Sequence, residues 1–354
     1  MSGDERLKAQ ISAYGPLTIA QYMTWRLHDP QDGYYATQPA LGEDGDFITA
    51  PLVSQMFGEL LGLWAAEVWS RLGRPTQVIL AEAGPGDGTL MTDVLRAARL
   101  EPAFLQAARL CLIETSPALR TVQAERLAAA PLTPQWRDSL EDLPQDAPVI
   151  LLANELLDCL PARQFLRTPA GWAERMVGLD ANDALTFGLA PCPPVATAPQ
   201  AEPGQILEAS AAQESFAATL AGRLVQQGGA ALLVDYGRAE PGFGDTLQAL
   251  KRHRKVSPLE AGADLTIHAD FPAVAAAARG AGARTTPILT QALFLDRLGI
   301  HQRAHALAIA RPDRAEIVQR QLARLTAPEH MGALFKVLGI YAPSLDILPG
   351  FEEP

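Results

Sequence analysis

Apolar residues follow two spacings along the chain, and each spacing predicts a different kind of element. Short unbroken runs rich in Val, Ile and Leu are typical of strands that are buried on both faces of a sheet. Such runs occur at residues 78–80, 109–113, 149–153 and 230–234, with a shorter one at 135–137. Because helical patterns separate these runs, the sequence predicts an α/β fold with a parallel sheet.

The second spacing, in which apolar residues recur at three and four, is typical of helices. Thr18 and Ser54 are suitable N-caps for helices at 19–27 and 55–72. Further helices are expected at 3–13, 89–99, 116–130, 210–227 and 270–280, followed by a helical tail that begins at residue 291.

Domain organisation follows from the order of these patterns. Residues 164–189 alternate between apolar and polar side chains and contain turn signals, which predicts a small β-rich segment. We therefore divide the chain into an N-terminal helical region, residues 1–73, which includes the GDFITAP loop, and an α/β core, residues 74–354. The core is expected to carry a β-rich and helical insertion at about 160–227.

The most informative stretch is TQVILAEAGPGDGTL, from Thr76 to Leu90. It predicts a strand, a tight turn containing Gly84, Gly86 and Gly88, and the start of a helix. Glycine lets the backbone turn sharply and lets a ligand approach without meeting a Cβ atom, and a helix N-terminus offers unpaired amide groups. A dinucleotide-binding turn has the spacing GxGxxG. Here the third glycine comes one residue early and Thr89 takes its place, which disfavours a nicotinamide dehydrogenase.

Polar side chains follow the predicted strands at their C-terminal ends, where open parallel sheets bind ligands. Glu114 lies one strand–helix–strand repeat beyond the glycine turn, at the place where an acid can grip a ribose hydroxyl pair. The strands after it end at Asp138 and at Asn154, Glu155 and Asp158. We expect these side chains to lie at one site with the glycine turn.

Composition and charge narrow the function classes. The 354 residues include 40 acidic and 29 basic ones, a formal net charge of −11. This charge argues against a nucleic-acid groove, which needs a basic footprint, and is compatible with a basic protein substrate. The basic run at 251–255 is expected to be a solvated face. The three cysteines are isolated in the sequence and do not indicate a metal site. His301 and His305 lack the acid of an HExxH motif, so they do not indicate one either.

The N-terminus MSGDERLKAQ contains acids and no apolar core, unlike a signal peptide or a basic transit peptide. No apolar run approaches the ~20 residues that a membrane span needs. We therefore expect a cytoplasmic protein that does not insert into a membrane.

Several runs together resemble one family, the MidA or complex I assembly factor family of S-adenosylmethionine (SAM)-dependent methyltransferases. These runs are GYYATQ, GDFITAPLVSQMFGELLGLW, EAGPGDGTLMTDVLR, NELLDCLPARQF, DYG, GDTLQAL, ADLTIHADF and MGALFKVLG. They occur in the family's order from near Gly15 to Gly339. The resemblance implies a Rossmann-like core of seven strands with helical and β additions, and SAM as the cofactor.

The family's cofactor positions fall on residues of the glycine turn and the next strand end, namely Glu82, Gly84, Gly86, Gly88 and Glu114. Asp138 follows the short third strand, where an acid in SAM enzymes often meets the adenine amino group. Pro85, Asn154 and Thr49 complete the residues that we expect to contact the cofactor.

Mitochondrial members of the family are held to dimethylate an arginine on a subunit of respiratory complex I, which implies a protein substrate of that kind. Carboxylates can pair bidentately with a guanidinium group and orient it. We expect Glu155 and Asp158 to do so, with Asp46 as a further candidate, although capping of the following turn is the alternative for the first two. Asp264, His268 and Asp270 belong to a family block and have no role here beyond capping and packing.

This chain departs from the family in the loop GDFxTSPExSQ, which falls on residues 45–55. The family's Ser and Glu are Ala50 and Leu52 here. If that glutamate contacts a guanidinium, the acceptor differs in this protein, or the protein binds SAM and docks on a partner without turnover. The sequence leaves the methyltransferase and the docking factor open as alternatives.

Overall fold

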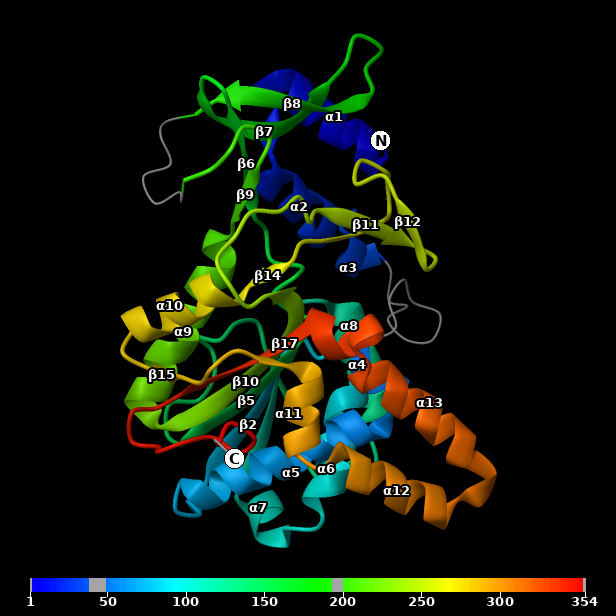
Figure 1. Ribbon diagram of the computed structural model, residues 1–354, viewed down its shortest axis with the longest axis vertical. Coiled ribbons are helices and arrows are strands. Elements are labelled where there is room, and N and C mark those ends of the chain that lie inside the picture. Colours follow the sequence, from blue (N-terminus) through cyan, green and yellow to red (C-terminus); the bar gives the residue numbers. More distant parts are fainter. Residues whose placement is uncertain (1, 38–48, 193–199, 353–354) are drawn as a thin grey trace.

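The computed structural model describes residues 2–37, 49–192 and 200–352. Figure 1 shows a lower part built on one large sheet and an upper part built on two small sheets and the N-terminal helices. Asp46 lies outside the described residues. Within the described ranges, no helix combines the length and the apolar character needed to cross a bilayer.

The large sheet contains the parallel strands that the apolar runs predict. Its parallel strands lie in the order β10–β5–β2–β3–β4. Their bounds are Gly229–Arg238, Val149–Asn154, Val78–Ala83, Ala108–Ile113 and Gln135–Arg137. The path continues from β10 to β17 (Phe335–Tyr341) and β15 (Arg284–Thr285), with the short strands β14 (Ala269–Asp270) and β16 (Leu289–Thr290) beside it. Counted over the described ranges, the path contains seven strands.

Strand β17 corrects the sequence analysis, which described the chain from residue 291 onward as a helical tail. Helices α11 (Gln291–Arg297), α12 (Ile300–Ala310) and α13 (Ala315–Thr326) form, but Phe335–Tyr341 is a strand antiparallel to β10. Its sequence FKVLGIY is a short apolar run, and periodicity alone does not distinguish a buried strand of this length from a buried helix. Pairing with β10 decides between the two.

Alternate residues of each strand pack against different helices, as the pleat of a sheet requires. Val78 and Leu80 face the layer that contains α5 (Gln55–Arg71) and α6 (Thr89–Ala98). Ile79 and Ala81 face the opposite layer, which contains α9 (Ala211–Gln227) and α10 (Phe271–Gly280). Both faces of β2 are thus fully buried, which explains its unbroken apolar sequence.

The upper part has its own apolar core. Helices α1 (Gly3–Tyr14) and α2 (Ile19–His28) pack on a sheet in the order β1–β7–β6–β9, with β8 paired to β7, and on the small sheet β12–β11–β13. The strands of the first sheet are Leu17–Thr18, Gly171–Leu179, Arg163–Thr168, Ile206–Ala209 and Leu185–Pro191. Those of the second are Arg254–Val256, Gln248–Lys251 and Asp264–Thr266.

These packings differ from the domain division drawn from the sequence. Helix α5 lies before residue 74, yet it packs on the large sheet, and α9 lies within 160–227, yet it covers the other face of that sheet. The upper part instead gathers three separate stretches of the chain: the N-terminal helices, strands β6 to β9, and the hairpin around β11. A division of the sequence into consecutive segments cannot describe a core that is built from three separate stretches of the chain.

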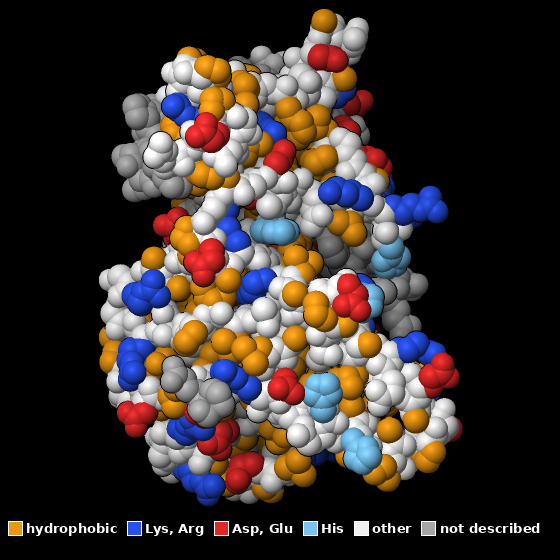
Figure 2. Space-filling view, in the orientation of Figure 1, with side chains coloured by type: hydrophobic (Ala, Val, Ile, Leu, Met, Phe, Trp, Pro, Cys, Tyr) orange, Lys and Arg blue, Asp and Glu red, His pale blue; other side chains and the backbone are white. Residues whose placement is uncertain are grey.

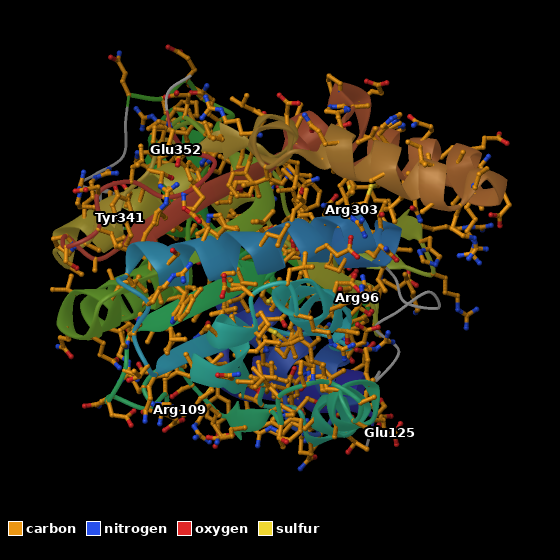
Figure 3. The ribbon with its side chains drawn as sticks, turned by 90° about the horizontal axis from the view of Figure 1, so that it is seen from below. Arg96, Arg109, Glu125, Arg303, Tyr341 and Glu352 are labelled. Carbon is orange, nitrogen blue, oxygen red and sulfur yellow. The ribbon has the colours of Figure 1, made fainter. Side chains whose placement is uncertain are left out.

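A buried acid joins the C-terminal helices to the lower part. Glu59 on α5 pairs with Arg303 of α12 at 2.7 Å and with Arg96 of α6 at 3.1 Å. Figure 3 labels the two arginines, which come from helices on the two sides of α5. The Glu59 side chain is only 8% exposed, whereas the Arg96 and Arg303 side chains are 42% and 38% exposed. These two ion pairs and a hydrogen bond from Gln55 Nε2 at 3.2 Å therefore replace the water that the buried carboxylate lacks.

Replacing Glu59 by Gln should lower the free energy of unfolding by about 1–2 kcal/mol. The loss is smaller than for a fully buried pair because the arginines keep part of their hydration. Glu316→Gln on α13 is the matched control, since the Glu316 side chain is 87% exposed in its pair with Arg320. Chemical denaturation of both variants checks this, and equal stability of the two would contradict the proposed role of Glu59.

Candidate active site

A cavity of about 580 Å³ lies at the C-terminal ends of β2, β3 and β5, where the lower and upper parts meet. The lower part contributes the glycine turn, the strand ends and α9, and the upper part contributes residues of α2, α3 (Tyr34–Thr37) and β13. The cavity brings together most of the residues expected from the sequence, namely Thr49, Glu82, Gly84, Pro85, Gly86, Glu114, Asp138, Asn154, Glu155 and Asp158.

The glycine turn forms one wall of this cavity. Gly84 and Gly86 have φ angles of +67° and +54°, which favour glycine, and Gly88 is the left-handed N-cap of α6. A Cβ atom on Gly84 would lie 2.9 Å from Leu156 Cδ1. Gly88 is not among the lining residues but starts the helix behind them. The backbone is therefore open to a ligand along this turn.

Glu82 is the next-to-last residue of β2, just before the turn, and is only 2% exposed. Its Oε2 atom receives no hydrogen bond from any residue whose position is described. Burial, together with the nearby Asp87, raises the pKa of Glu82 to about 8. A buried carboxylate oxygen without a partner is costly in isolation, and a polar or cationic ligand in the cavity would remove that cost.

Glu114 is fixed at the end of β3 by two hydrogen bonds. Its Oε1 accepts from the Ser116 amide at 2.7 Å, and its Oε2 accepts from Gln123 Nε2 at 3.2 Å. Burial raises the pKa of Glu114 above its usual value, against the effect of these bonds. The carboxylate thus lines the cavity in one orientation, beside the glycine turn.

Gln123, which the sequence analysis missed, connects these features. It lies on α8 (Pro117–Arg126), is fully buried, and donates to the Gly86 carbonyl at 2.8 Å as well as to Glu114. Its Oε1 accepts from Trp136 Nε1 at 2.8 Å. A signal was present in the sequence, because Gln123 lies between Leu119 and Leu127 on the apolar stripe of its helix. A polar side chain at such a position is buried and requires hydrogen-bond partners.

Asp138 occupies the exposed rim of the cavity. Its side chain is 78% exposed and pairs with Arg120 at 2.5 Å. Arg120 also donates through Nε to the Glu114 carbonyl at 2.7 Å. Asp138 is therefore placed at the cavity next to Glu114, but its carboxylate already has a cationic partner.

Glu155 and Asn154 lie where β5 ends. Glu155 has a φ of +53°, and its Oε1 accepts from Asn154 Nδ2 at 3.0 Å and from the Ala50 amide at 3.2 Å. Burial, and to a smaller extent Asp158, raises the pKa of Glu155 to about 8. Ala50 starts the short helix α4 (Ala50–Val53), so this carboxylate joins the strand end to the segment that carries Thr49 and Leu52.

Asp158 lies in a second set of hydrogen bonds, with two residues of β10 to which the sequence analysis gave no role. Tyr236 donates its hydroxyl to Asp158 Oδ2. Asp235 is fully buried and accepts from the amides of Leu157 and Asp158, at 2.8 and 3.1 Å. Burial raises the pKa of Asp158 to about 6 and that of Asp235 well above its usual range. The available signal was the position of Asp235 at a strand end.

The upper part closes the side of the cavity that lies opposite the glycine turn. His28, Tyr35, Cys159 and Asp264 line the cavity on this side. Tyr35 donates to Asp264 Oδ1 at 3.5 Å, and its ring stacks on His28 with centroids 5.6 Å apart. Asp264, to which the sequence analysis gave only capping and packing, is thus a cavity residue.

The charge of the lining is one-sided. Eight carboxylates line the cavity, and the lining residues in the described part of the chain include no Lys and no Arg. These carboxylates are Glu82, Asp87, Glu114, Asp138, Glu141, Glu155, Asp158 and Asp264. A cavity lined in this way favours cationic ligands, because each cation offsets part of the repulsion and desolvation of the acids.

A family model described as "Putative S-adenosyl-L-methionine-dependent methyltransferase" matches residues 60–289. The chain belongs to this family. The "Protein arginine methyltransferase NDUFAF7 homolog, mitochondrial" of Drosophila melanogaster is 35% identical, covering 98% of this chain and 87% of the relative. The human protein arginine methyltransferase NDUFAF7, mitochondrial, is 34% identical, covering 94% of this chain and 82% of its own. A crystal structure from Burkholderia thailandensis with bound S-adenosyl-homocysteine has a TM-score of 0.85 at 26% identity, covering 99% of this chain and 94% of that one.

These relationships confirm the Rossmann-like methyltransferase fold expected from the resemblance, and they establish the protein as a SAM-dependent methyltransferase with SAM as its cofactor. The residues present fit that cofactor: the open glycine turn, the unpartnered oxygen of Glu82 and the acidic lining all suit a ligand that carries an ammonium and a sulfonium charge. A dinucleotide dehydrogenase and a docking factor without turnover are therefore not retained.

One expectation is overturned. The curated relatives are named as mitochondrial proteins, which contradicts the cytoplasmic location expected from the N-terminal residues. The inference failed because it used the charge of ten residues, whereas these names come from relatives similar along nearly the whole chain.

Replacing Gln123 by Leu should raise the Kd for SAM about tenfold. The change removes the donor to Gly86 and Glu114 and leaves the Trp136 indole N–H without its acceptor, and hydrogen bonds to charged groups are worth about 1.5–3 kcal/mol. Gln319→Leu, on the exposed side of α13, is the control. Isothermal titration calorimetry measures both, and an unchanged Kd in Gln123→Leu would refute the bridging role.

Proposed function

We propose that this methyltransferase transfers the methyl group of SAM to an arginine side chain of a partner protein, and that the partner is a respiratory complex I subunit or a protein like it. The observation that carries the proposal is the acidic end of the cavity beyond the glycine turn. The relatives that are named protein arginine methyltransferases support the same acceptor.

The cavity divides naturally between two ligands. SAM requires the end at Gly84, Gly86 and Glu114. The remaining end, under the roof of the upper part, is bounded by Glu155, Asp158, Tyr35 and Asp264. An acceptor has to enter there, and three of these four residues are carboxylic acids.

Among protein side chains, the guanidinium of arginine suits such a site best. It remains charged at any ordinary pH and presents a planar fork of N–H donors that matches carboxylates. Glu155 and Asp158 follow the end of β5 on one side of the acceptor, and Asp264 lies in the roof on the other. Carboxylates on both sides would orient one nitrogen toward the methyl group, and orientation of this kind lowers a barrier without covalent chemistry.

Methylation of a guanidinium also releases a proton. SAM supplies a methyl group on a sulfonium; the new bond joins nitrogen to that carbon, the carbon–sulfur pair stays with the sulfur as a thioether, and the N–H proton has to be accepted. Asp158, with a pKa of about 6, is ionised at neutral pH and is the base that we favour. Glu155, with a pKa of about 8, is protonated before a cation binds and ionises beside one.

The departures at Ala50 and Leu52 fit this arrangement. Ala50 contributes its amide rather than its side chain to Glu155, so the loss of the family's Ser leaves that contact intact. Leu52 lines the cavity where the family carries Glu. This chain thus offers one carboxylate fewer at that wall and depends on Glu155, Asp158 and Asp264 for the guanidinium.

Cells that lack this protein should lose a methylated arginine on a complex I subunit. Reintroduction of the wild-type protein should restore the mark. Gly84→Val should not, because a β-branched residue is strained at the φ of +67° that the turn requires here. Peptide mass spectrometry of purified complex I tests this. A methylarginine pattern identical with and without the protein would exclude complex I as the substrate.

Activity should increase with pH through about 6. Below that value Asp158 is protonated and cannot accept the arginine proton, so kcat/KM falls. Asp158→Asn should reduce kcat by about 100-fold or more, the usual range for loss of a general base, and should retain SAM binding. Asp313→Asn, at an exposed ion pair on the surface, is the control. Full activity of Asp158→Asn would assign the proton to another group.

A further inference from the structure

We propose that the hairpin of β11 and β12 is a cationic docking element that selects protein substrates with an acidic side chain about three residues from the target arginine. The inference rests on the proposed function and defines its substrate class. It begins from residues 251–255, Lys-Arg-His-Arg-Lys, which form the tip of this hairpin.

The tip concentrates positive charge on a protein whose net charge is −11. Arg252 and His253 have φ angles of +51° and +59°, and Lys251 pairs with Arg254 across them. Two consecutive residues with positive φ form the tight type of hairpin turn that matches the twist of the strands. The cations are therefore presented on a short turn between paired strands and not on a long loop.

Strand register places the hairpin beside the acceptor end of the cavity. Leu250 of β11 pairs with Asp264 of β13 on one side and with Lys255 of β12 on the other. Neighbouring strands lie about 4.8 Å apart, so the backbone of Lys255 lies roughly 10 Å from that of Asp264. Asp264 lines the cavity, and Lys255 is therefore close to its rim.

The pleat also fixes which side chains share a face. Residues directly opposite each other in antiparallel strands point to the same face. Lys255 and Asp264 thus share one face of the small sheet, while Ala249 and Leu265 on the other face are buried in the core of the upper part. The Lys255 side chain therefore leaves the small sheet on the same side as that of Asp264, which lines the cavity.

Two of the tip cations make no ion pair in the part of the chain that the structure describes. Lys251 pairs with Glu260 at 3.1 Å and donates to the Ala261 carbonyl at 2.8 Å. Arg254 and Lys255 are exposed and take part in no such pair. Figure 2 shows Lys and Arg side chains at the upper right of the molecule, where Figure 1 places the hairpin of β11 and β12. These cations can therefore pair with a substrate.

The cavity and the hairpin impose opposite preferences at different distances from the arginine. An acidic side chain that enters with the guanidinium would lie among Glu155, Asp158 and Asp264 and is disfavoured there. An extended peptide advances about 3.3 Å per residue, so roughly three residues separate the arginine from a side chain that reaches Lys255. An acid is disfavoured next to the arginine and favoured at that spacing. A nucleic acid, with charge at every phosphate, would meet the acidic rim as well.

The experiment uses the full chain and two series of arginine peptides. The two peptides of a series differ only in having Glu or Gln three residues from the arginine. This position lies on the N-terminal side of the arginine in one series and on the C-terminal side in the other. We expect the Glu peptide of one of the two series to have a KM about three- to fivefold lower, the upper part of the range of an exposed ion pair, and the advantage to shrink in 0.5 M salt. Lys255→Glu should remove it and should prefer a peptide with Lys at that position. Arg314→Glu, an exposed arginine between α12 and α13, should behave like the wild type.

Equal KM values for Glu and Gln peptides with the wild-type protein, or an acidic preference that survives Lys255→Glu together with Arg254→Glu, would overturn the inference. Reversal of charge preference distinguishes docking from a structural role, because a damaged fold would lower activity on every peptide alike. The proposed function has a different failure: no arginine peptide of any charge is methylated while SAM still binds, and the inference then falls with it.

Discussion

The structure depends on carboxylates that are kept out of water at one end of a parallel sheet. Glu82, Asp158 and Asp235 are each 5% exposed or less, and burial raises the pKa of all three. Such groups are costly unless amides, hydroxyls or cations surround them. Asp235 obtains backbone amides and Asp158 the Tyr236 hydroxyl, whereas one oxygen of Glu82 has no partner among the described residues. A cation that binds beside these acids removes the remaining cost, and this gain in free energy contributes to the site's affinity for positively charged ligands.

That affinity suits both ligands of a SAM-dependent methyl transfer to arginine. The donor carries a sulfonium and the proposed acceptor carries a guanidinium, and two cations approach one another only if fixed negative charge surrounds them. The acids that are ionised at neutral pH provide part of this charge before either ligand arrives, as electrostatic preorganisation requires. Glu82 and Glu155, with pKa values of about 8, ionise only beside a cation. The same acids exclude anionic side chains, so the proposed acceptor specificity and catalysis have a common origin.

The upper part turns this acidic edge into an enclosed site. It is assembled from α1 to α3, from strands between β5 and α9, and from the hairpin after β10, so that three returns of the chain meet over the strand ends. Through Tyr35 and Asp264 it supplies the roof. Because loops after parallel strands tolerate insertions, a methyltransferase sheet can acquire a substrate-binding part of this kind without altering the glycine turn or Glu114.

The sequence by itself determined the five parallel strands of the large sheet, the glycine turn and ten of the residues that line the cavity. Buried strands such as Val78–Ala83 are recognisable from unbroken apolar runs, and the C-terminal ends of parallel strands must meet at one edge. Only the tertiary structure decided which residues far apart in the sequence contact one another. Gln123 beneath the turn, Asp264 above Asp158 and strand β17 at the sheet are defined by partners tens to hundreds of residues away. Local periodicity contains no information about such partners, because long-range pairing and burial, not nearby residues, stabilise them.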